Sequence, residues 1–354
     1  MTARGKIATL LLCAFISAGF MILLYISSEK QRHDANPFIR RYTTGAAEMA
    51  NNIDLKNTTM YFIGTEGSKI YMGDMQAPLH LFVFDTLLKT KKHFKINLES
   101  DQFPFTRVQI KIRPPYFYVA DGSVPVIFKG RISDWRAKLL MSGNKQFFTH
   151  AEIISEDEIA IRSFQADGRG TVIGKFTFRD SLQVSYAPWL LQKQIDGYFD
   201  VDGILKYDQD IQKFIYLYYY RNEFIVADNK LELQYRGKTI DTNHIADLKI
   251  SYNKETGERQ LASSSIAVNR LMSSSGNLMF VNSNVPGCYE DEEMWKQASV
   301  VDVYDLNKRR YVSSFYIHSF DEKISDMLVV KSNIYVIIGH HLHRYKLNKE
   351  LSGR

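Results

Sequence analysis

The sequence predicts an all-β fold, a six-bladed β-propeller, preceded by one transmembrane helix. Three observations support this prediction: a charge-free apolar stretch near the N-terminus, many short β-type runs after it, and a turn motif that recurs six times. Aromatic residues make up 13% of the 354-residue chain. Flat aromatic side chains favour the pleated, half-buried surface of strands, so composition agrees with pattern.

The apolar stretch covers residues 7–26 and contains no charged residue. A helix of about 20 residues crosses roughly 30 Å of hydrocarbon. Arg4 and Lys6 precede the stretch, and the more basic flank of such a helix stays in the cytoplasm. We therefore expect a cytoplasmic N-terminus over residues 1–6, a retained signal anchor, and the remainder in the periplasm, as a single-pass protein of a bacterial inner membrane. The alternative is a signal peptide cleaved near Ser27 and Ser28.

Charge and cysteine content argue against a nucleic-acid-binding protein and against a disulfide-stabilised exported domain. The net charge of +6 is too small to indicate a nucleic-acid partner. Cys13 lies within the apolar stretch, so Cys288 alone remains outside it and the exported domain has no internal disulfide. We expect Cys288 to be a partly buried, inert residue, with a redox or intermolecular role as the alternative.

Internal self-similarity is the main evidence for blades. The segment from His80, HLFVFDTLLKTKKHF, matches the segment from Ser299, SVVDVYDLNKRRYV, and the segment from His340 repeats the turn Tyr-x-Leu-Asn-Lys. In this register, an aromatic residue before a polar turn recurs at Phe84, Phe128, Phe178, Tyr235, Tyr304 and Tyr345. The separations are close to the roughly 40 to 50 residues of a four-stranded blade once insertions are allowed. Six blades follow.

The last blade shows only three strands, around residues 326–330, 334–338 and 342–347, before the chain ends. A propeller ring must close because open strand edges expose unpaired backbone groups. We expect residues 27–56 to form a linker with a candidate ring-closing strand at Phe38–Thr44, and residues 57–354 to form the propeller.

On these six marks, residues 57–347 resemble the six-bladed β-propellers of the TolB-like and NHL-like kind, in a membrane-anchored bacterial form. The resemblance implies a binding platform, although some such propellers are hydrolases or lyases, so it does not select a function. The Trp-Asp and Gly-His signatures of WD40 blades are absent as a regular series.

The first strand of each blade lines the central channel, and polar residues near its start converge on the channel mouth. In our register these candidate ligand-binding residues are Arg107, His150, Asp202, Arg270 and Asp326. The two arginines suit an anionic group, while the histidine and carboxylates suit orientation of a ligand or proton exchange. The alternative is that these side chains are only hydrated or paired with one another.

A histidine cluster and an acidic cluster are both explained by ordinary surface structure rather than by a binding site. His340, His341 and His343 include two imidazoles on one strand face, yet an exposed strand end explains them without a metal, so we expect no metal and no cofactor. The acidic run 290–293 is expected to be a solvated loop, with a partner contact as the alternative.

No haem-attachment, Cys-x-x-Cys, zinc-protease, P-loop or serine-hydrolase motif occurs in the sequence. We therefore favour a non-enzymatic envelope module that recruits a protein or small ligand at the cytoplasmic membrane. One alternative is a hydrolase or lyase with His150 as acid or base and Arg107 or Arg270 stabilising an anion. Another is an accessory protein of an envelope redox system that acts through Cys288. The identity of the ligand and the oligomeric state are left open.

Overall fold

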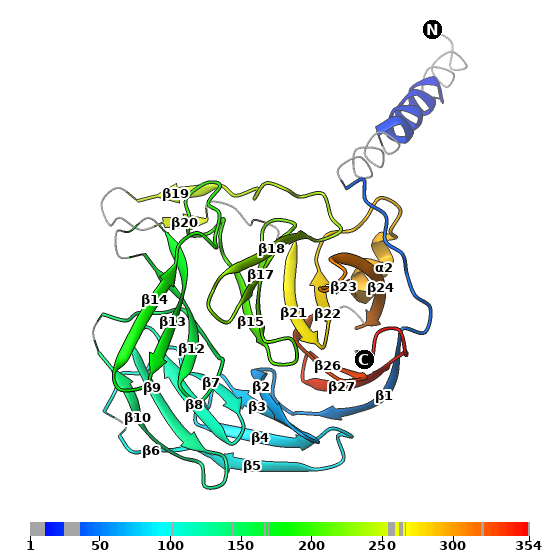
Figure 1. Ribbon diagram of the computed structural model, residues 1–354. Coiled ribbons are helices and arrows are strands. Elements are labelled where there is room, and N and C mark those ends of the chain that lie inside the picture. Colours follow the sequence, from blue (N-terminus) through cyan, green and yellow to red (C-terminus); the bar gives the residue numbers. More distant parts are fainter. Residues whose placement is uncertain are drawn as a thin grey trace.

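The computed structural model describes residues 11–24, 36–100, 102–143, 145–165, 168, 170–253, 259–261, 265, 267–319 and 322–352. In these residues, six blades, each with four antiparallel strands, surround a central axis; the second blade has a fifth, parallel strand at its outer edge, and the predicted six-bladed propeller is confirmed (Figure 1). In the first five blades the strands follow chain order from the axis outward.

The blades have the following strands. Blade one consists of β2 (Met60–Glu66), β3 (Lys69–Asp74), β4 (His80–Asp85) and β5 (Lys91–Lys95). Blade two consists of β7 (Gln109–Arg113), β8 (Tyr116–Asp121), β9 (Val126–Arg131) and β10 (Arg136–Ser142), with the short β6 (Asn97–Leu98) parallel to β10. Blade three consists of β11 (His150–Ile153), β12 (Glu158–Phe164), β13 (Thr171–Phe178) and β14 (Leu182–Ala187).

Blade four consists of β15 (Gly203–Asp208), β16 (Lys213–Tyr218), β17 (Glu223–Asp228) and β18 (Leu233–Lys238). A hairpin, β19 (Ile250–Tyr252) and β20 (Arg259–Leu261), follows it. Blade five consists of β21 (Asn269–Ser275), β22 (Leu278–Ser283), β23 (Ala298–Asp305) and β24 (Arg310–His318), with α2 (Glu292–Gln297) before β23. Blade six consists of β25 (Ile324–Val330), β26 (Asn333–Ile338), β27 (His341–Leu347) and β1 (Ala47–Asp54).

The hydrophobic core lies between blades. Each of the six buried clusters in the described residues joins two neighbouring blades, such as Phe117 and Trp135 of blade two with Tyr71 of blade one. This follows from alternation along each strand, which gives every blade two apolar faces. The ring therefore depends on all six interfaces.

The turn motif marks the third strand in five blades, with Tyr235 as the exception. Tyr235 lies on β18, the fourth strand of blade four, so its interpretation as an equivalent mark is wrong. The third strand, β17, ends in Val226, Ala227 and Asp228 instead. Asp228 still accepts hydrogen bonds from the backbone N–H groups of Lys230 and Glu232, so the turn is kept without the aromatic residue.

An N-terminal strand closes the ring, but it is β1 and not Phe38–Thr44. β1 pairs antiparallel with β27 from Ala47 opposite Leu347 to Asp54 opposite His341, and Figure 1 shows the blue strand beside the red one. Residues 38–44 instead run along β24, where Tyr42 forms one bridge with Ser314. β1 is mostly exposed and polar, as an outer strand can be, and therefore lacks the apolar alternation that signals a strand.

Residues 11–24 are helical. Within the described part of the chain, no helix is long and apolar enough to cross a membrane.

Candidate functional site

The central channel is lined by the innermost strands of all six blades and has a volume of about 900 Å³. Its wall includes residues from β2, β7, β11, β15, β21 and β25. Because each blade presents its innermost strand to the central axis, residues of all six inner strands border the channel. Side chains from segments far apart in the sequence therefore meet here.

Glu152 is the centre of a charged cluster in this wall. Its Oε1 lies 2.5 Å from the Nζ of Lys111 on β7, 2.9 Å from the Nε2 of His150 and 3.6 Å from the Nζ of Lys206 on β15. His150 and Glu152 are two residues apart on β11, so alternation brings both to the same face. Three adjacent blades thus share one carboxylate.

Burial and neighbouring charges shift the pKa values of these groups in different directions. Although burial opposes ionisation, Lys111 and Lys206 hold the pKa of Glu152 well below its usual range. The Glu152 charge raises the pKa of Lys206. Burial lowers the pKa of His150 to about 4, despite its hydrogen bond to Glu152. At neutral pH the cluster therefore contains an ionised Glu152, a charged Lys206 and a neutral His150.

Asp326 faces the same channel from blade six. Its Oδ2 accepts a hydrogen bond of 2.8 Å from the backbone N–H of Phe62 in blade one, and its Oδ1 accepts one of 2.8 Å from that of Met327. Burial raises its pKa. The contact with Phe62 joins the inner strands of blades six and one.

Basic groups exceed acidic groups in the channel. Among its described lining residues, four have basic side chains and two are carboxylates: Arg107, Lys111, Arg113 and Lys206 against Glu152 and Asp326. Burial lowers the pKa of Lys111, although Glu152 opposes this effect. Low-dielectric walls strengthen the field of an uncompensated charge in such a space. The arrangement favours an anion.

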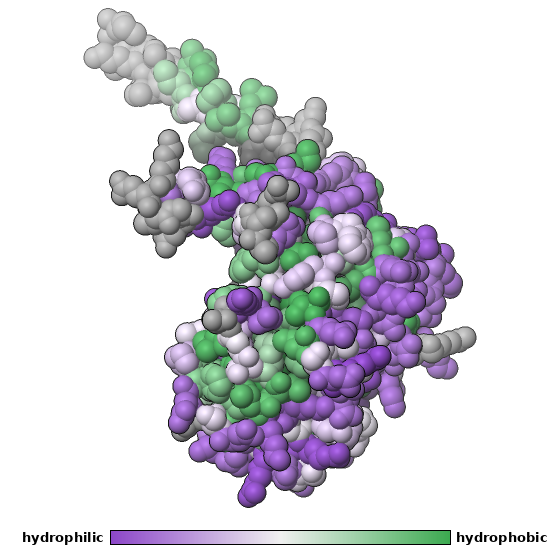
Figure 2. Space-filling model, turned by 60° about the vertical axis from the view of Figure 1, so that its left-hand side comes forward, coloured by the Kyte–Doolittle hydropathy of each residue, from purple (hydrophilic) through white to green (hydrophobic). Residues whose placement is uncertain are grey.

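A second cavity, of about 950 Å³, adjoins the channel between blades two and three and shares Thr106, Arg107 and Gln109 with it. Phe147, Phe164 and Tyr186 contribute to its wall and are each 43–48% exposed. Figure 2 brings this side of the molecule forward and shows hydrophobic side chains gathered there between hydrophilic ones. We call this cavity the mouth pocket.

The five predicted channel residues are only partly brought together. Arg107, His150 and Asp326 line the channel. Asp202 accepts a hydrogen bond from Arg162 in a separate pocket of about 490 Å³, while Arg270 on β21 lines neither the channel nor these two pockets. Our register placed Asp202 and Arg270 at the strand starts, but their side chains do not join the channel cluster.

Sequence reasoning missed Lys111, Glu152 and Lys206. All three lie two or more residues inside an inner strand, deeper than the strand starts that we considered. The available signal was alternation, since Glu152 follows His150 by two residues and Lys111 follows Gln109 by two.

The acidic run 290–293 begins a helix. Asp291 caps α2 by accepting hydrogen bonds from the backbone N–H groups of Glu293 at 2.6 Å and Met294 at 3.4 Å. The acidic residues in the first turn also interact favourably with the helix dipole.

Glu290 contacts the chain's own N-terminal segment, residues 36–46, which we call the strap. Its carboxylate accepts hydrogen bonds from Arg40 Nη1 at 2.8 and 3.0 Å and from the Tyr42 hydroxyl at 2.8 Å.

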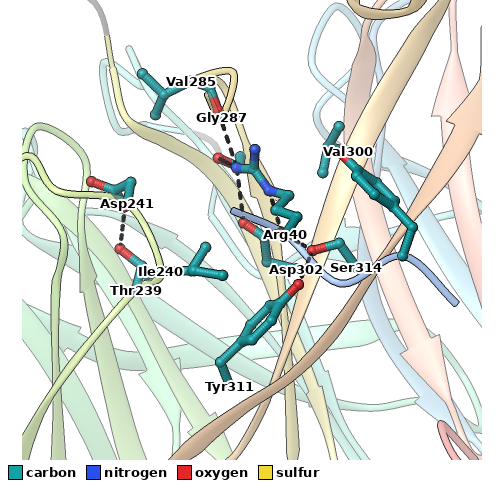
Figure 3. A network of polar contacts seen from close by, with 12 residues as sticks. Arg40, Thr239, Ile240, Asp241, Val285, Gly287, Val300, Asp302, Tyr311 and Ser314 are labelled. Atoms are coloured by element: carbon teal, nitrogen blue, oxygen red, sulfur yellow. Dashed lines mark hydrogen bonds and ion pairs between the residues drawn. The ribbon is translucent and has the colours of Figure 1, made fainter. Parts of the chain in front are cut away.

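Arg40 fixes the strap to blade five, as Figure 3 shows. Its guanidinium also donates to Asp302 at 2.8 and 3.2 Å and to the Val285 carbonyl at 3.1 Å. The Arg40 side chain is fully buried, as is nearly all of the Asp302 side chain. Cys288 lies beside this network, half-buried, and its backbone N–H donates to the carbonyl of Phe38 at 3.0 Å. The strap therefore contacts the backbone at Cys288, the residue on which the redox hypothesis depends.

Comparison with known proteins finds likeness only among solved structures. No family model and no curated protein matches the sequence. A protein of unknown function from Bacteroides thetaiotaomicron VPI-5482 superposes with a TM-score of 0.52 at 8% identity, over 88% of this chain and 76% of that chain. A streptogramin B lyase structure gives a TM-score of 0.48 at 10% identity, over 85% of this chain and 97% of that chain. At such identities the likeness is one of fold: this chain is a six-bladed β-propeller.

Proposed function

We propose that the chain is a membrane-anchored binding module of the bacterial envelope whose propeller holds an anionic small molecule in its channel. The observation that carries the proposal is the composition of the channel wall: four basic side chains and only two carboxylates line a described volume of about 900 Å³. Lys206 is the best placed to contact a ligand, because its side chain is 37% exposed and only 3.6 Å from the carboxylate that it shares with Lys111.

Binding is favoured over hydrolase or lyase chemistry by the state of His150. A general acid or base works best with a pKa near the operating pH, whereas the pKa of His150 is lowered to about 4. A neutral imidazole fixed to Glu152 suits the orientation of a ligand better than the transfer of a proton.

The membrane part of the proposal rests on the sequence. Residues 7–26 supply the anchor, and Arg4 and Lys6 before them favour a periplasmic propeller. The TolB-like and NHL-like resemblance belongs to the same proposal. Eleven residues, 27–37, separate the anchor from Phe38 and extend over about 40 Å at most.

This short tether orients the propeller. Phe38 and Arg40 contact the β22–β23 connection, and the equivalent β8–β9 connection in blade two contributes Gly122 and Ser123 to the mouth pocket. Equivalent connections lie on one face of a propeller, so the strap and the mouth pocket share a face. We propose that this face is directed toward the membrane.

Ligand-induced stabilisation tests the binding function. The full-length protein in detergent is heated with citrate, succinate or inorganic phosphate at millimolar concentration. We expect at least one of these anions to raise the melting temperature, since a ligand that binds only the folded state stabilises it by mass action. Lys206→Gln should remove the shift, whereas Lys308→Gln, which changes a side chain that is 66% exposed on blade five, should keep it.

Absence of a shift with all three anions would overturn the binding proposal. An equal shift in wild type and Lys206→Gln would place the anion outside the channel and overturn the assignment of the site.

A further inference from the structure

We infer that the chain binds one zinc ion at the seam of the ring, through His340, His341 and Asp54. This site is independent of the channel and of the proposed anion ligand. Sequence reasoning interpreted the histidines as an exposed strand end because it did not place Asp54 beside them.

The geometry of the three side chains suits a small divalent ion. One ligand atom from each, an imidazole nitrogen or a carboxylate oxygen, lies within 4.8 Å of the other two. Zinc binds such atoms at about 2.0–2.2 Å, so a common centre is reached by small rotations of the side chains. Asp54 and His340 are exposed and His341 is half-buried, so these rotations meet little resistance. Three protein ligands leave one tetrahedral position for water.

The backbone holds the three residues in place. Asp54 and His341 are the last pair of the β1–β27 ladder, and the backbone N–H of Leu55 donates to the carbonyl of His340 at 2.8 Å. Gly339, with a φ of +56°, allows the tight turn between β26 and β27 that presents His340 next to His341. Asp54 Oδ1 accepts from the backbone N–H of Lys56 at 2.7 Å, which orients the carboxylate and leaves Oδ2 to take the metal.

The ligands come from opposite ends of the propeller sequence, so a bound ion would link the two strands that close the ring. Asp54 belongs to the N-terminal strand that closes the ring, and the histidines belong to the C-terminal hairpin. Opening the ring requires β1 to leave β27, which would separate the ligands. Zinc therefore stabilises the closed ring, because it binds the closed form only.

One other pair of histidines provides a matched control. His80 Nδ1 and His93 Nε2 lie 2.9 Å apart on blade one, and their rings stack with centroids 5.0 Å apart. Neither belongs to a group of three candidate ligands in the described residues. A substitution there removes a surface histidine without touching the seam.

The test is a zinc titration of the full-length protein in detergent, purified without a histidine tag and freed of metal by a chelator. Calorimetry measures stoichiometry and affinity, and a parallel heating experiment measures the melting temperature. We expect one equivalent of zinc to bind and to raise the melting temperature by several degrees. Asp54→Asn and His340→Ala should each weaken binding at least tenfold and abolish the thermal shift, whereas His80→Ala should change neither.

The metal-free variants also report on folding. Because Asp54 and His340 are exposed, their metal-free melting temperatures should equal that of the metal-free wild type. Lack of stoichiometric zinc binding would overturn the inference. So would loss of binding in His80→Ala with binding retained in Asp54→Asn.

Discussion

At the scale of single residues, a shared carboxylate organises the channel. Glu152 binds Lys111 and His150 directly and lies close to Lys206, so three side chains depend on one carboxylate. His150 is the member whose protonation changes in an accessible pH range, because burial lowers its pKa to about 4 from an ordinary value of 6.5.

We predict that acidification destabilises the fold through His150. The unfolded chain takes up a proton near pH 6.5 and the folded chain near pH 4, so the stabilisation is complete above pH 6.5 and is lost as the pH falls toward 4. Between pH 7 and pH 5 the loss is about 2 kcal/mol. Urea denaturation at both pH values measures it. His150→Gln should reduce this loss by about the same amount, and an unchanged pH dependence in that variant would contradict the assignment.

Arg40 supports a second prediction. Arg40→Met leaves the Asp302 and Glu290 carboxylates buried without their cation, which costs about 3–5 kcal/mol of unfolding free energy. Trp295 fluorescence reports the change locally, because the guanidinium of Arg40 lies 5.5 Å from the centre of that ring.

The control is Arg41→Gln at the next position, where the side chain is exposed, donates to the backbone carbonyls of Tyr311 and Val312 and lies over the Tyr311 ring. Its cost should stay below about 1 kcal/mol. Equal losses in the two variants would show that the buried ion pairs do not hold the strap.

The same residues show what sequence alone could predict of the site. His150 and Asp326 were expected at the channel because polar residues at the starts of inner strands converge there, and both line it. Lys206 and Lys111 were not expected, since a lysine inside a strand is equally compatible with either face until the register is known. Asp54 was not expected near His340, because 285 residues separate them in the sequence.

At the scale of elements, β1 closes the ring, which is the task that the sequence analysis assigned to Phe38–Thr44, and the strap contacts blade five instead. Phe38–Thr44 contains aromatic and basic residues, and Arg40 and Tyr42 of this segment contact blade five. β1 completes blade six with a mainly exposed sequence, so the backbone ladder with β27 supplies its pairing. Backbone pairing leaves little trace in a sequence, whereas the interior strands are visible as short runs of β-branched and aromatic residues.

We predict that two truncations separate these tasks. A chain that begins at Gly45 keeps β1 and should still form the closed ring, with a lower melting temperature because the Arg40 network is lost. A chain that begins at Lys56 lacks β1, exposes the β27 edge and should aggregate or lose cooperative unfolding. Circular dichroism melts and size-exclusion chromatography distinguish the two. Normal melting of the Lys56 chain would mean that ring closure by β1 is dispensable.

At the scale of the whole molecule, the proposed arrangement is a propeller held close to a membrane by a short tether. A reporter fused after Arg354 should be active in the periplasm and inactive in the cytoplasm, because basic residues such as Arg4 and Lys6 before an apolar helix favour a cytoplasmic N-terminus. Alkaline phosphatase and green fluorescent protein fusions measure the two sides. Replacing Arg4 and Lys6 by glutamate is the matched variant and should reduce correct insertion. Cytoplasmic activity of the wild-type fusion would reverse the proposed topology.

The central claim, that the channel holds an anion, is tested most directly by a crystal structure of the full-length protein grown with citrate. The account predicts electron density for citrate inside the channel, with a carboxylate within hydrogen-bond distance of Lys206 and the other end directed toward Arg107 at the mouth. The same crystals of Lys206→Gln should lack this density. Citrate bound only elsewhere on the protein, or a channel that contains water alone at saturating citrate, would contradict the account.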